Sequence, residues 1–226
     1  MLDVITPSTQ EDHQSELREM FELRYRALIK HERWEALSSA DNREVDEFDT
    51  ERAYYLLSRI KAEGPIVGCV RFVSSEGPTL SSETFSHLFE TAGLPTGRDI
   101  FDVSRFVVDP AIRSKETISP ITSELYCGWM EFGMALGLKA LTAVVDLRHM
   151  QGVIARGVKV EPLGLPIESG KMRILGVLIP TDQENLDAMR AYRGLQKPVL
   201  SQSQKLELQN ARHLDQGRRG LRREAG

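Results

Sequence analysis

Residues 118–145 read ISPITSELYCGWMEFGMALGLKALTAVV, and this stretch contains a helix followed at once by a strand. Apolar side chains recur at helical spacing at Ile118, Ile121, Leu125, Trp129, Phe132 and Leu136. Gly137 is suited to end this helix, and residues 140–145 form a short apolar strand. A helix that leads directly into a buried strand is typical of folds that mix the two elements.

Upstream of this stretch, the chain is rich in strands. A helix is predicted over residues 15–33, where apolar side chains have helical spacing and neither Gly nor Pro interrupts them. A polar, acid-rich loop follows at 38–49. Strands are then predicted at 54–57, 67–73 and 102–108.

Downstream, strand and helix alternate. A helix ending at Gly157 is followed by a strand at 173–179 and by a helix that ends near Tyr192. No change of composition marks a linker, so we expect a single α/β (α+β) domain over residues 1–193. Residues 194–226 are rich in Gln and Arg, which predicts a peripheral or partly disordered tail.

The composition argues against several functional classes. The chain has 226 residues and a formal net charge of −4, a balance that disfavours a nucleic-acid-binding protein. It contains no Walker-type phosphate loop, no G-x-G-x-x-G and no G-x-S-x-G. The five histidines are scattered, and no C-x-x-C or H-x-x-x-H provides the spacing of metal ligands, so we expect no metal.

The sequence also predicts a compartment. The N-terminus lacks the basic and apolar regions of a secretory signal, and no apolar run approaches the roughly 18 residues needed to cross a bilayer. Cys69 and Cys127 lie in apolar stretches, which is typical of buried, inert thiols in a reducing compartment. We therefore expect a cytoplasmic protein without stable membrane insertion.

A first cluster of candidate functional residues begins on the predicted helix 15–33. Arg24 lies among its apolar residues, and Trp34, Asp46 and Asp49 follow. A tryptophan face and nearby carboxylates both attract a cation. The alternative is a solvated acidic loop in which Trp34 is a hydrophobic anchor, and composition alone favours that alternative.

A second cluster lies on two predicted strands. Arg71 stands in one of them, and the other reads Asp102-Val103-Ser104-Arg105-Phe106. A period of two predicts that Asp102 and Ser104 share one face and that Arg105 lies on the other. Charges flanked by Val and Phe are costly to bury unless they are paired. A salt bridge between strands and a functional site are equally compatible with this pattern.

The two clusters together resemble a known family. The sequence contains, in order, Arg24, Trp34, Asp46-x-x-Asp49, Gly68-x-x-Arg71, Phe85 and Ser104-Arg105-Phe106. This pattern resembles the acyl-homoserine-lactone synthases, the autoinducer synthases of bacterial quorum sensing. The resemblance runs from about residue 20 to about residue 110, and a weaker continuation reaches Gly157.

Two positions depart from the family pattern. The chain has Leu28 where the family usually has an aromatic residue, and Asp102 where it usually has Glu. The resemblance implies that the acid at position 102 takes the proton of a reacting amine. Because Asp102 is one methylene shorter, it would act directly or through a water molecule.

The resemblance implies a two-step acyl transfer. Family members acylate the amine of S-adenosylmethionine from a thioester of acyl carrier protein or coenzyme A. They then lactonise the product to an N-acyl-homoserine lactone and release 5′-methylthioadenosine. These molecules are substrates, and no further cofactor is implied.

The charged residues can be assigned to this chemistry in more than one way. Asp102, Arg71 and Arg105 are the implied catalytic residues, with Ser104 bordering the substrate. The first cluster suits the sulfonium through Trp34, Asp46 and Asp49, whereas Arg24 or Arg105 suits the carboxylate. Equally, the charged side chains would pair with one another and hold the loop over the substrate.

The implied fold is similar to that of the N-acetyltransferases, a mixed twisted sheet flanked by helices with a cleft between splayed central strands. The acyl chain would lie in that cleft, lined by Phe85, Phe106 and the strand at 140–145. Thr142 or Val145 would take the position where a threonine favours 3-oxo chains in some members. Chain length, oxidation at the 3-position and the choice between fatty and aryl groups stay open.

Two other functions compete with the synthase. One is an acetyl-coenzyme A-dependent N-acetyltransferase of the same fold, and the other is a non-catalytic ligand-binding relative. Acetyltransferases hold pyrophosphate on a Gly-rich loop, but residues 108–117 contain no glycine and offer only Arg113 and Lys115. The change at Asp102 keeps the ligand-binding alternative open. Release of 5′-methylthioadenosine would separate the three.

Charge is distributed unevenly along the chain. Acids crowd residues 44–51. Basic residues recur later at Arg148, Arg156, Lys159, Lys171, Arg173, Arg218, Arg219, Arg222 and Arg223. Because acyl carrier proteins are strongly acidic, a carrier would dock on this later half. The sequence leaves the oligomeric state open.

Overall fold

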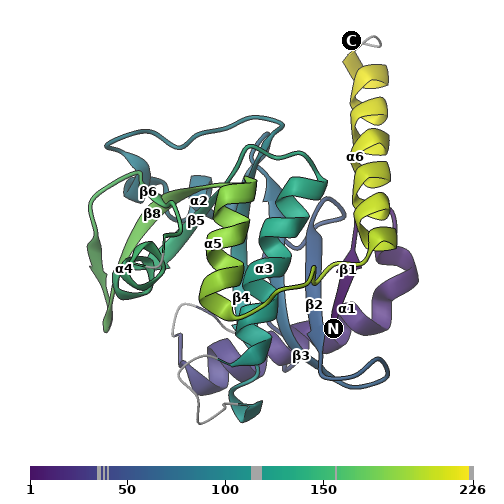
Figure 1. The fold of residues 1–226 in the computed structure, drawn as a ribbon, viewed down its shortest axis with the longest axis horizontal. Coiled ribbons are helices and arrows are strands. Elements are labelled where there is room, and N and C mark those ends of the chain that lie inside the picture. The colour runs from purple at the N-terminus through teal and green to yellow at the C-terminus, as the bar shows by residue number, and fades with distance from the viewer. Residues whose placement is uncertain (35–36, 38, 40, 113–118, 156, 224–226) are drawn as a thin grey trace.

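One open sheet of eight strands forms the centre of the computed structural model (Figure 1). The structure describes residues 1–34, 37, 39, 41–112, 119–155 and 157–223, with side chains up to residue 214. The strands are β1 (Leu2–Ile5), β2 (Tyr54–Arg59), β3 (Ile66–Ser74), β4 (Ile100–Val108), β5 (Ala140–Asp146), β6 (Glu161–Pro162), β7 (Ile167–Ser169) and β8 (Met172–Pro180). Their order is β1-β2-β3-β4-β5-β8-β6, and β7 also pairs with β8.

Helices cover both faces of this sheet. The α-helices are α1 (Gln14–Arg24), α2 (Leu80–Glu83), α3 (Pro120–Ala135), α4 (Leu147–Ile154), α5 (Gln183–Arg193) and α6 (Gln202–Arg223). Short 3-10 helices are η1 (Gln10–His13), η3 (Ser86–Phe89) and η4 (Pro110–Ile112), and α1 continues as a π-helix, η2 (Tyr25–His31). In Figure 1, α3 and α5 lie side by side in front of the sheet, and α1 lies behind it.

Each face has its own apolar core. Leu125 and Phe132 of α3 pack on Phe72 of β3, with the Phe72 and Phe132 rings stacked at 4.0 Å. On the other face, Leu23 of α1 packs in a core with Leu57 of β2. This arrangement of helices on both faces of a mixed sheet is the predicted α/β fold, and the prediction is confirmed.

Gly68 of β3 allows α3 to approach the sheet closely. A Cβ atom at this position would lie 2.8 Å from Leu125 Cδ1, which is too close for a real contact. The glycine of the Gly68-x-x-Arg71 pattern therefore has a packing role.

The parallel strands β4 and β5 part along their length. Their register runs only from Ile100 opposite Ala140 to Val103 opposite Ala143, although β4 continues to Val108 and β5 to Asp146. All other strand pairs are antiparallel. The sheet is thus mixed and splayed at its centre, as the resemblance implied.

β4 also contains a bulge next to this splay. Cys69 of β3 pairs with Val107, and Arg71 pairs with Ser104, so two steps on β3 span three steps on β4. The extra residue is accommodated at Arg105, whose φ of 54° lies in the left-handed region. Such a conformation is rare outside glycine and redirects a side chain from its alternating face.

The predicted elements largely match the observed ones, but strands β1, β6 and β7 and helix α6 were not predicted. Strand β1 pairs with β2 through Val4 opposite Leu56. The segment after Gly194 forms α6, which projects past the sheet in Figure 1. Within the described residues, no helix is long and apolar enough to span a membrane.

The start of the predicted tail is docked through Glu131 of α3. This buried carboxylate accepts hydrogen bonds from the backbone N–H groups of Val199 and Leu200 and from Arg190 of α5, at 2.8–3.1 Å. Lys205 Nζ of α6 lies 3.0 Å from Oε2 of Glu131, the oxygen that also accepts from Leu200. The tail therefore begins as a packed segment, and the division of the chain at residue 193 stays a prediction.

Candidate active site

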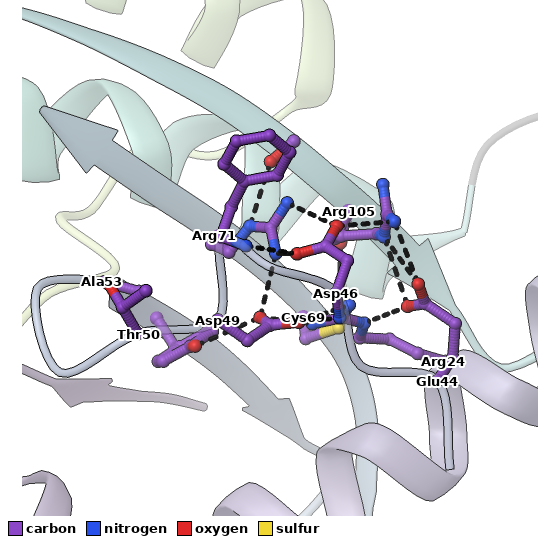
Figure 2. A network of polar contacts seen from close by, with 12 residues as sticks. Arg24, Glu44, Asp46, Asp49, Thr50, Ala53, Cys69, Arg71 and Arg105 are labelled. Carbon is purple, nitrogen blue, oxygen red and sulfur yellow. Dashed lines mark hydrogen bonds and ion pairs between the residues drawn. The ribbon is translucent and has the colours of Figure 1, made fainter. Parts of the chain in front are cut away.

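Three arginines and three carboxylates meet on the face of the sheet covered by α1. Arg24 comes from the end of α1, Arg71 from β3 and Arg105 from the β4 bulge. The carboxylates come from the loop between η2 and β2 and are Glu44, Asp46 and Asp49. We call these six residues the ionic network, and Figure 2 shows them converging from α1, the loop and two strands.

Arg24 is the innermost member and is fully buried. Its Nη1 and Nη2 atoms donate to the two carboxylate oxygens of Asp49, each at 2.8 Å, and its Nε donates to Glu44 at 2.5 Å. Asp49 also accepts from the Tyr55 hydroxyl at 3.1 Å. Because all three nitrogens of the Arg24 guanidinium donate to carboxylates of the loop, Arg24 fixes the loop against the sheet.

Arg71 and Arg105 share Asp46. Arg71 donates to both oxygens of Asp46, one of them at 2.9 Å, and to the Ser104 hydroxyl at 3.1 Å. Arg105 lies 2.6 Å from Asp46 and donates to Glu44 at 2.8 Å. The prediction that Arg105 lies on the face opposite Ser104 is wrong, because the bulge turns its side chain to the same face.

Exposure divides the network into two parts. The side chains of Arg24, Arg71 and Asp49 are 0% exposed, whereas Asp46 is 16% and Arg105 is 6% exposed. Asp46 offers the most surface to a ligand, and Arg105 is the least buried of the three arginines, whereas Arg24, one of two candidates for the substrate carboxylate, offers none. Burial raises the pKa of Asp49, but Arg24 and Arg71 oppose this and hold it well below its usual value.

Asp102 lies on the same face but has a different environment. It is buried on β4, and its Oδ1 accepts hydrogen bonds from the Ser81 hydroxyl at 2.5 Å and the Thr142 hydroxyl at 3.3 Å. Arg71 is the cation that acts on it from β3. Burial raises the pKa of Asp102 to about 6, and the hydroxyl contacts and Arg71 only partly offset this. A carboxylate with this pKa can accept a proton near neutral pH.

The four residues predicted to line the acyl cleft do not share one face. Thr142 lies beside Asp102, and Phe85 packs with the apolar group around η3. Phe106 and Val145 lie on the α3 face and are half-buried. The two pairs lie on opposite faces of β4 and β5, near the strands that part, so a single wall made of all four does not form.

Several predicted residues lie away from these contacts or outside the described part of the chain. Trp34 follows η2 and is 40% exposed, so the structure does not place it in the ionic network. Ile118, Arg113, Lys115 and Arg156 lie outside the described residues. The side chains of Arg218, Arg219, Arg222 and Arg223 are also outside them. The predicted burial of both thiols is confirmed, and it raises the pKa of Cys69 to about 12 and of Cys127 to about 11.

Two residues of the site were missed by sequence reasoning. Glu44 bridges Arg24 and Arg105, but in the sequence it is one acid among several in a polar loop. Ser81 meets Asp102 from α2, 21 residues away along the chain. Neither contact leaves a signal in a single sequence, because both depend on how distant segments pack.

Comparison with known proteins agrees with this site and fold. The family model described as autoinducer synthase matches residues 8–189. An acyl-homoserine-lactone synthase from Agrobacterium fabrum is 29% identical over 81% of this chain and 87% of its own length. An isovaleryl-homoserine lactone synthase from Bradyrhizobium diazoefficiens is 26% identical over 92% of both chains.

Solved structures give the same result. The structure of BjaI, a CoA-dependent acyl-homoserine lactone synthase with SAM and isopentyl-CoA, has a TM-score of 0.78. It is 25% identical and covers 88% of this chain and 91% of its own. A putative N-acetyltransferase from Lactobacillus plantarum, 14% identical, has a TM-score of 0.52 over 80% of this chain and 99% of its own, which shows the fold alone.

The fold is thus that of the N-acyltransferases, a mixed sheet with helices on both faces. The chain belongs to the autoinducer synthase family and is an acyltransferase of the acyl-homoserine-lactone synthase type.

Proposed function

We propose that this protein transfers an acyl group from a coenzyme A thioester to the amine of S-adenosylmethionine and closes the product to an N-acyl-homoserine lactone. The observation that carries this proposal is the position of Asp102. It is a buried carboxylate with a pKa raised to about 6, on β4 where β4 and β5 part, beside the ionic network. Family membership supports the reaction class.

In the first step, Asp102 is the general base. An α-amino group has a pKa near 8 and is largely protonated at neutral pH. Asp102 accepts this proton, directly or through one water molecule, and the free amine attacks the thioester carbonyl. The C–N bond forms, the C–S bond breaks, and coenzyme A leaves as a thiolate, which takes up the second proton that the nitrogen loses as the amide forms. Proton transfer of this kind contributes about 10²- to 10⁴-fold to a rate.

In the second step, the substrate's own carboxylate is the nucleophile. Its oxygen attacks the γ-carbon, the C–O bond of the lactone forms, and the bond to the sulfonium breaks. Sulfur keeps the electron pair and leaves as neutral 5′-methylthioadenosine. Arg105 is the least buried arginine of the network, so we assign it to orient this carboxylate.

The cationic part of S-adenosylmethionine is assigned to Asp46 and Trp34. Asp46 is the most exposed carboxylate of the ionic network, and Trp34 carries an exposed indole ring. A carboxylate and a ring face both favour a sulfonium. Arg24, Glu44 and Asp49 then hold the loop that carries Asp46, and they bind no substrate themselves.

Coenzyme A is favoured over acyl carrier protein by the surface charges. Three of the basic residues in the later half pair with acids: Arg148 with Asp146 at 2.9 Å, Lys159 with Glu184 at 2.5 Å and Arg173 with Glu168 at 3.4 Å. This pairing weakens the positive surface that an acidic carrier would need. BjaI is also described as CoA-dependent.

The test is to supply purified protein with S-adenosylmethionine and matched donors on coenzyme A or acyl carrier protein. We expect release of 5′-methylthioadenosine together with a lactone, and faster turnover with coenzyme A donors. No release with any donor from folded protein would contradict the proposal. Binding without release would favour a ligand-binding relative, and an open-chain N-acyl product would favour an N-acetyltransferase.

A further inference from the structure

Asp102 is held from two elements by hydroxyl groups that donate to the same one of its oxygens. The Ser81 hydroxyl of α2 lies 2.5 Å from Oδ1, and the Thr142 hydroxyl of β5 lies 3.3 Å from it. The backbone N–H of Ser81 also acts on this carboxylate. A carboxylate oxygen accepts about two hydrogen bonds, so the two hydroxyls use Oδ1 fully. A proton from a substrate would therefore arrive at Oδ2.

The start of α2 holds Ser81 in place. Thr79 Oγ1 accepts the backbone N–H of Ser82 at 3.1 Å, and the Thr79 N–H donates to the Ser82 hydroxyl at 2.9 Å. This reciprocal capping box closes the first turn of the helix. Thr79 and Ser81 are both buried. The Ser81 hydroxyl is therefore fixed between α2 and β4.

The space between α2 and β4 is filled at this point. Ser81, Asp102 and Thr142 are each 1% exposed, and the 2.5 Å between Ser81 Oγ and Asp102 Oδ1 leaves no room for another atom. Glutamate, the usual residue of the family at position 102, is longer by one C–C bond, which is about 1.5 Å. Its carboxylate would collide with the Ser81 hydroxyl. Alanine at position 81 would free about the space that the extra methylene needs, so the two changes together conserve volume.

We propose that Ser81 is a positioning residue for the acyl transfer, and that its hydroxyl takes the place of the methylene by which Asp102 is shorter than glutamate. This inference rests on the proposed function, in which Asp102 is the base. Ser81 touches no substrate itself; it holds Oδ1 so that Oδ2 is presented to the amine. Ser81 and Asp102 therefore form one unit, and the effect of a longer acid depends on the side chain at position 81.

The test is a double-mutant cycle of Asp102→Glu and Ser81→Ala. Release of 5′-methylthioadenosine at saturating substrates and pH 7.5 gives kcat, and thermal melting reports the packing. We expect Asp102→Glu alone to lower kcat about tenfold or more and to lower the melting temperature, because the longer acid is overpacked and misplaced. We expect the double variant to melt higher than Asp102→Glu and to turn over about threefold faster or more, although Ser81→Ala alone is slower than the wild type.

Thr142→Val is the matched control for the freed space. It removes the other hydroxyl that donates to Oδ1, but valine is about as large as threonine and leaves no room for a methylene. Combined with Asp102→Glu, it should restore neither kcat nor the melting temperature. If Ser81→Ala gives no recovery, or if Thr142→Val gives an equal one, the inference is wrong.

Two further results separate positioning from a purely structural role. Across the cycle, kcat should change more than KM for S-adenosylmethionine, because Ser81 acts on the base. A melting temperature that recovers in the double variant without kcat would show that Ser81 is only structural, and would overturn the proposal.

Titration of Asp102 followed by carbon NMR of its carboxyl group requires no turnover. In Ser81→Ala the pKa of Asp102 should rise by about one unit, the effect of one hydrogen bond to a charged group. If the wild type releases no 5′-methylthioadenosine, the proposed function fails, whereas the melting cycle and this titration still decide the pairing. Additive changes in melting temperature together with an unmoved pKa would overturn the pairing of Ser81 with Asp102.

Discussion

Asp49 and Asp102 lie on the same face of the sheet, yet their environments shift their pKa values in opposite directions. Arg71 contacts Asp49 directly and acts on Asp102 through its charge. Asp49 meets Arg24 in a two-point pair and Arg71 at 2.9 Å, and its pKa is held well below the usual value. Asp102 meets the hydroxyls of Ser81 and Thr142, and burial raises its pKa to about 6. An aspartate is therefore an anion at neutral pH in the case of Asp49, and a proton acceptor in the case of Asp102.

This difference shows how one face can hold both a scaffold and a base. A buried carboxylate paired with guanidinium groups gives up its basicity, because protonation would leave those cations unpaired. A buried carboxylate with neutral partners keeps enough basicity to take a proton near neutral pH.

Asp102→Asn is expected to have the largest effect. The amide keeps the shape and still accepts from Ser81, but it cannot take a proton, so turnover should fall about 10²- to 10⁴-fold. The melting temperature at pH 7.5 should not fall, because the raised pKa of Asp102 means that its charge disfavours the fold above pH 6. Steady-state turnover, calorimetry with S-adenosylmethionine and thermal melting check this. An equal loss of S-adenosylmethionine affinity and turnover would show that Asp102 binds rather than accepts a proton.

Asp49→Asn is expected to act on stability. Removing one partner of a buried ion pair costs about 3–5 kcal/mol of unfolding free energy, measured by urea denaturation. Asp41→Asn changes an exposed, paired aspartate of the same loop and should leave the denaturation midpoint unchanged. Because the pKa of Asp49 is lowered in the fold, its contribution is present above pH 4 and is lost as pH falls below it. The gap between wild type and variant should therefore shrink in acid, and a constant gap would contradict the pairing.

Asp46→Asn should separate binding from scaffolding. Asp46 is the most exposed carboxylate of the ionic network, so its loss should raise KM for S-adenosylmethionine about tenfold. Its effect on the denaturation midpoint should be smaller than that of Asp49→Asn. If Asp49→Asn, in folded protein, raises KM for S-adenosylmethionine more than Asp46→Asn does, then Asp49 binds the substrate and Asp46 holds the loop, which contradicts the assignment.

The sequence alone predicts most of the fold and the identity of the charged residues, but not their arrangement. Arg24, Asp46, Asp49 and Arg71 were all named from the pattern, and the structure brings them together. The prediction of the face on which Arg105 lies was wrong, because a bulge adds one residue to β4 without any change in the hydrophobic pattern.

Other elements were missed for a different reason. β1 has only four residues, and one of them is charged, so its alternation is too short to recognise. α6 is strongly polar, and its contacts come from distant parts of the chain: Leu208 packs in the main core, Gln204 donates to the Leu2 carbonyl, and Lys205 pairs with Glu131 of α3. Long-range packing, which also creates the contact between Ser81 and Asp102, is not encoded in any local spacing.

Ser81→Ala is expected to have the smallest effect, and it acts on the base alone. The Ser81 hydroxyl stabilises the charged form of Asp102, so its removal should raise the pKa of Asp102 further. A hydrogen bond to a charged group corresponds to about one pKa unit, and the acid limb of the pH–rate profile should move up by about that much. Ser81→Thr, which keeps a hydroxyl, is the matched control. An unmoved limb in Ser81→Ala would show that Ser81 has only a structural role.

The most direct test of the account is the pH dependence of kcat/KM for S-adenosylmethionine in the wild type and in Asp102→Asn. If Asp102 takes the proton of the bound ammonium, the wild-type value should rise with pH through about 6, where Asp102 becomes charged. In Asp102→Asn the residual activity should instead rise near pH 8, where the amine loses its own proton. Profiles that rise at the same pH in both proteins would contradict the assignment of Asp102 as the base.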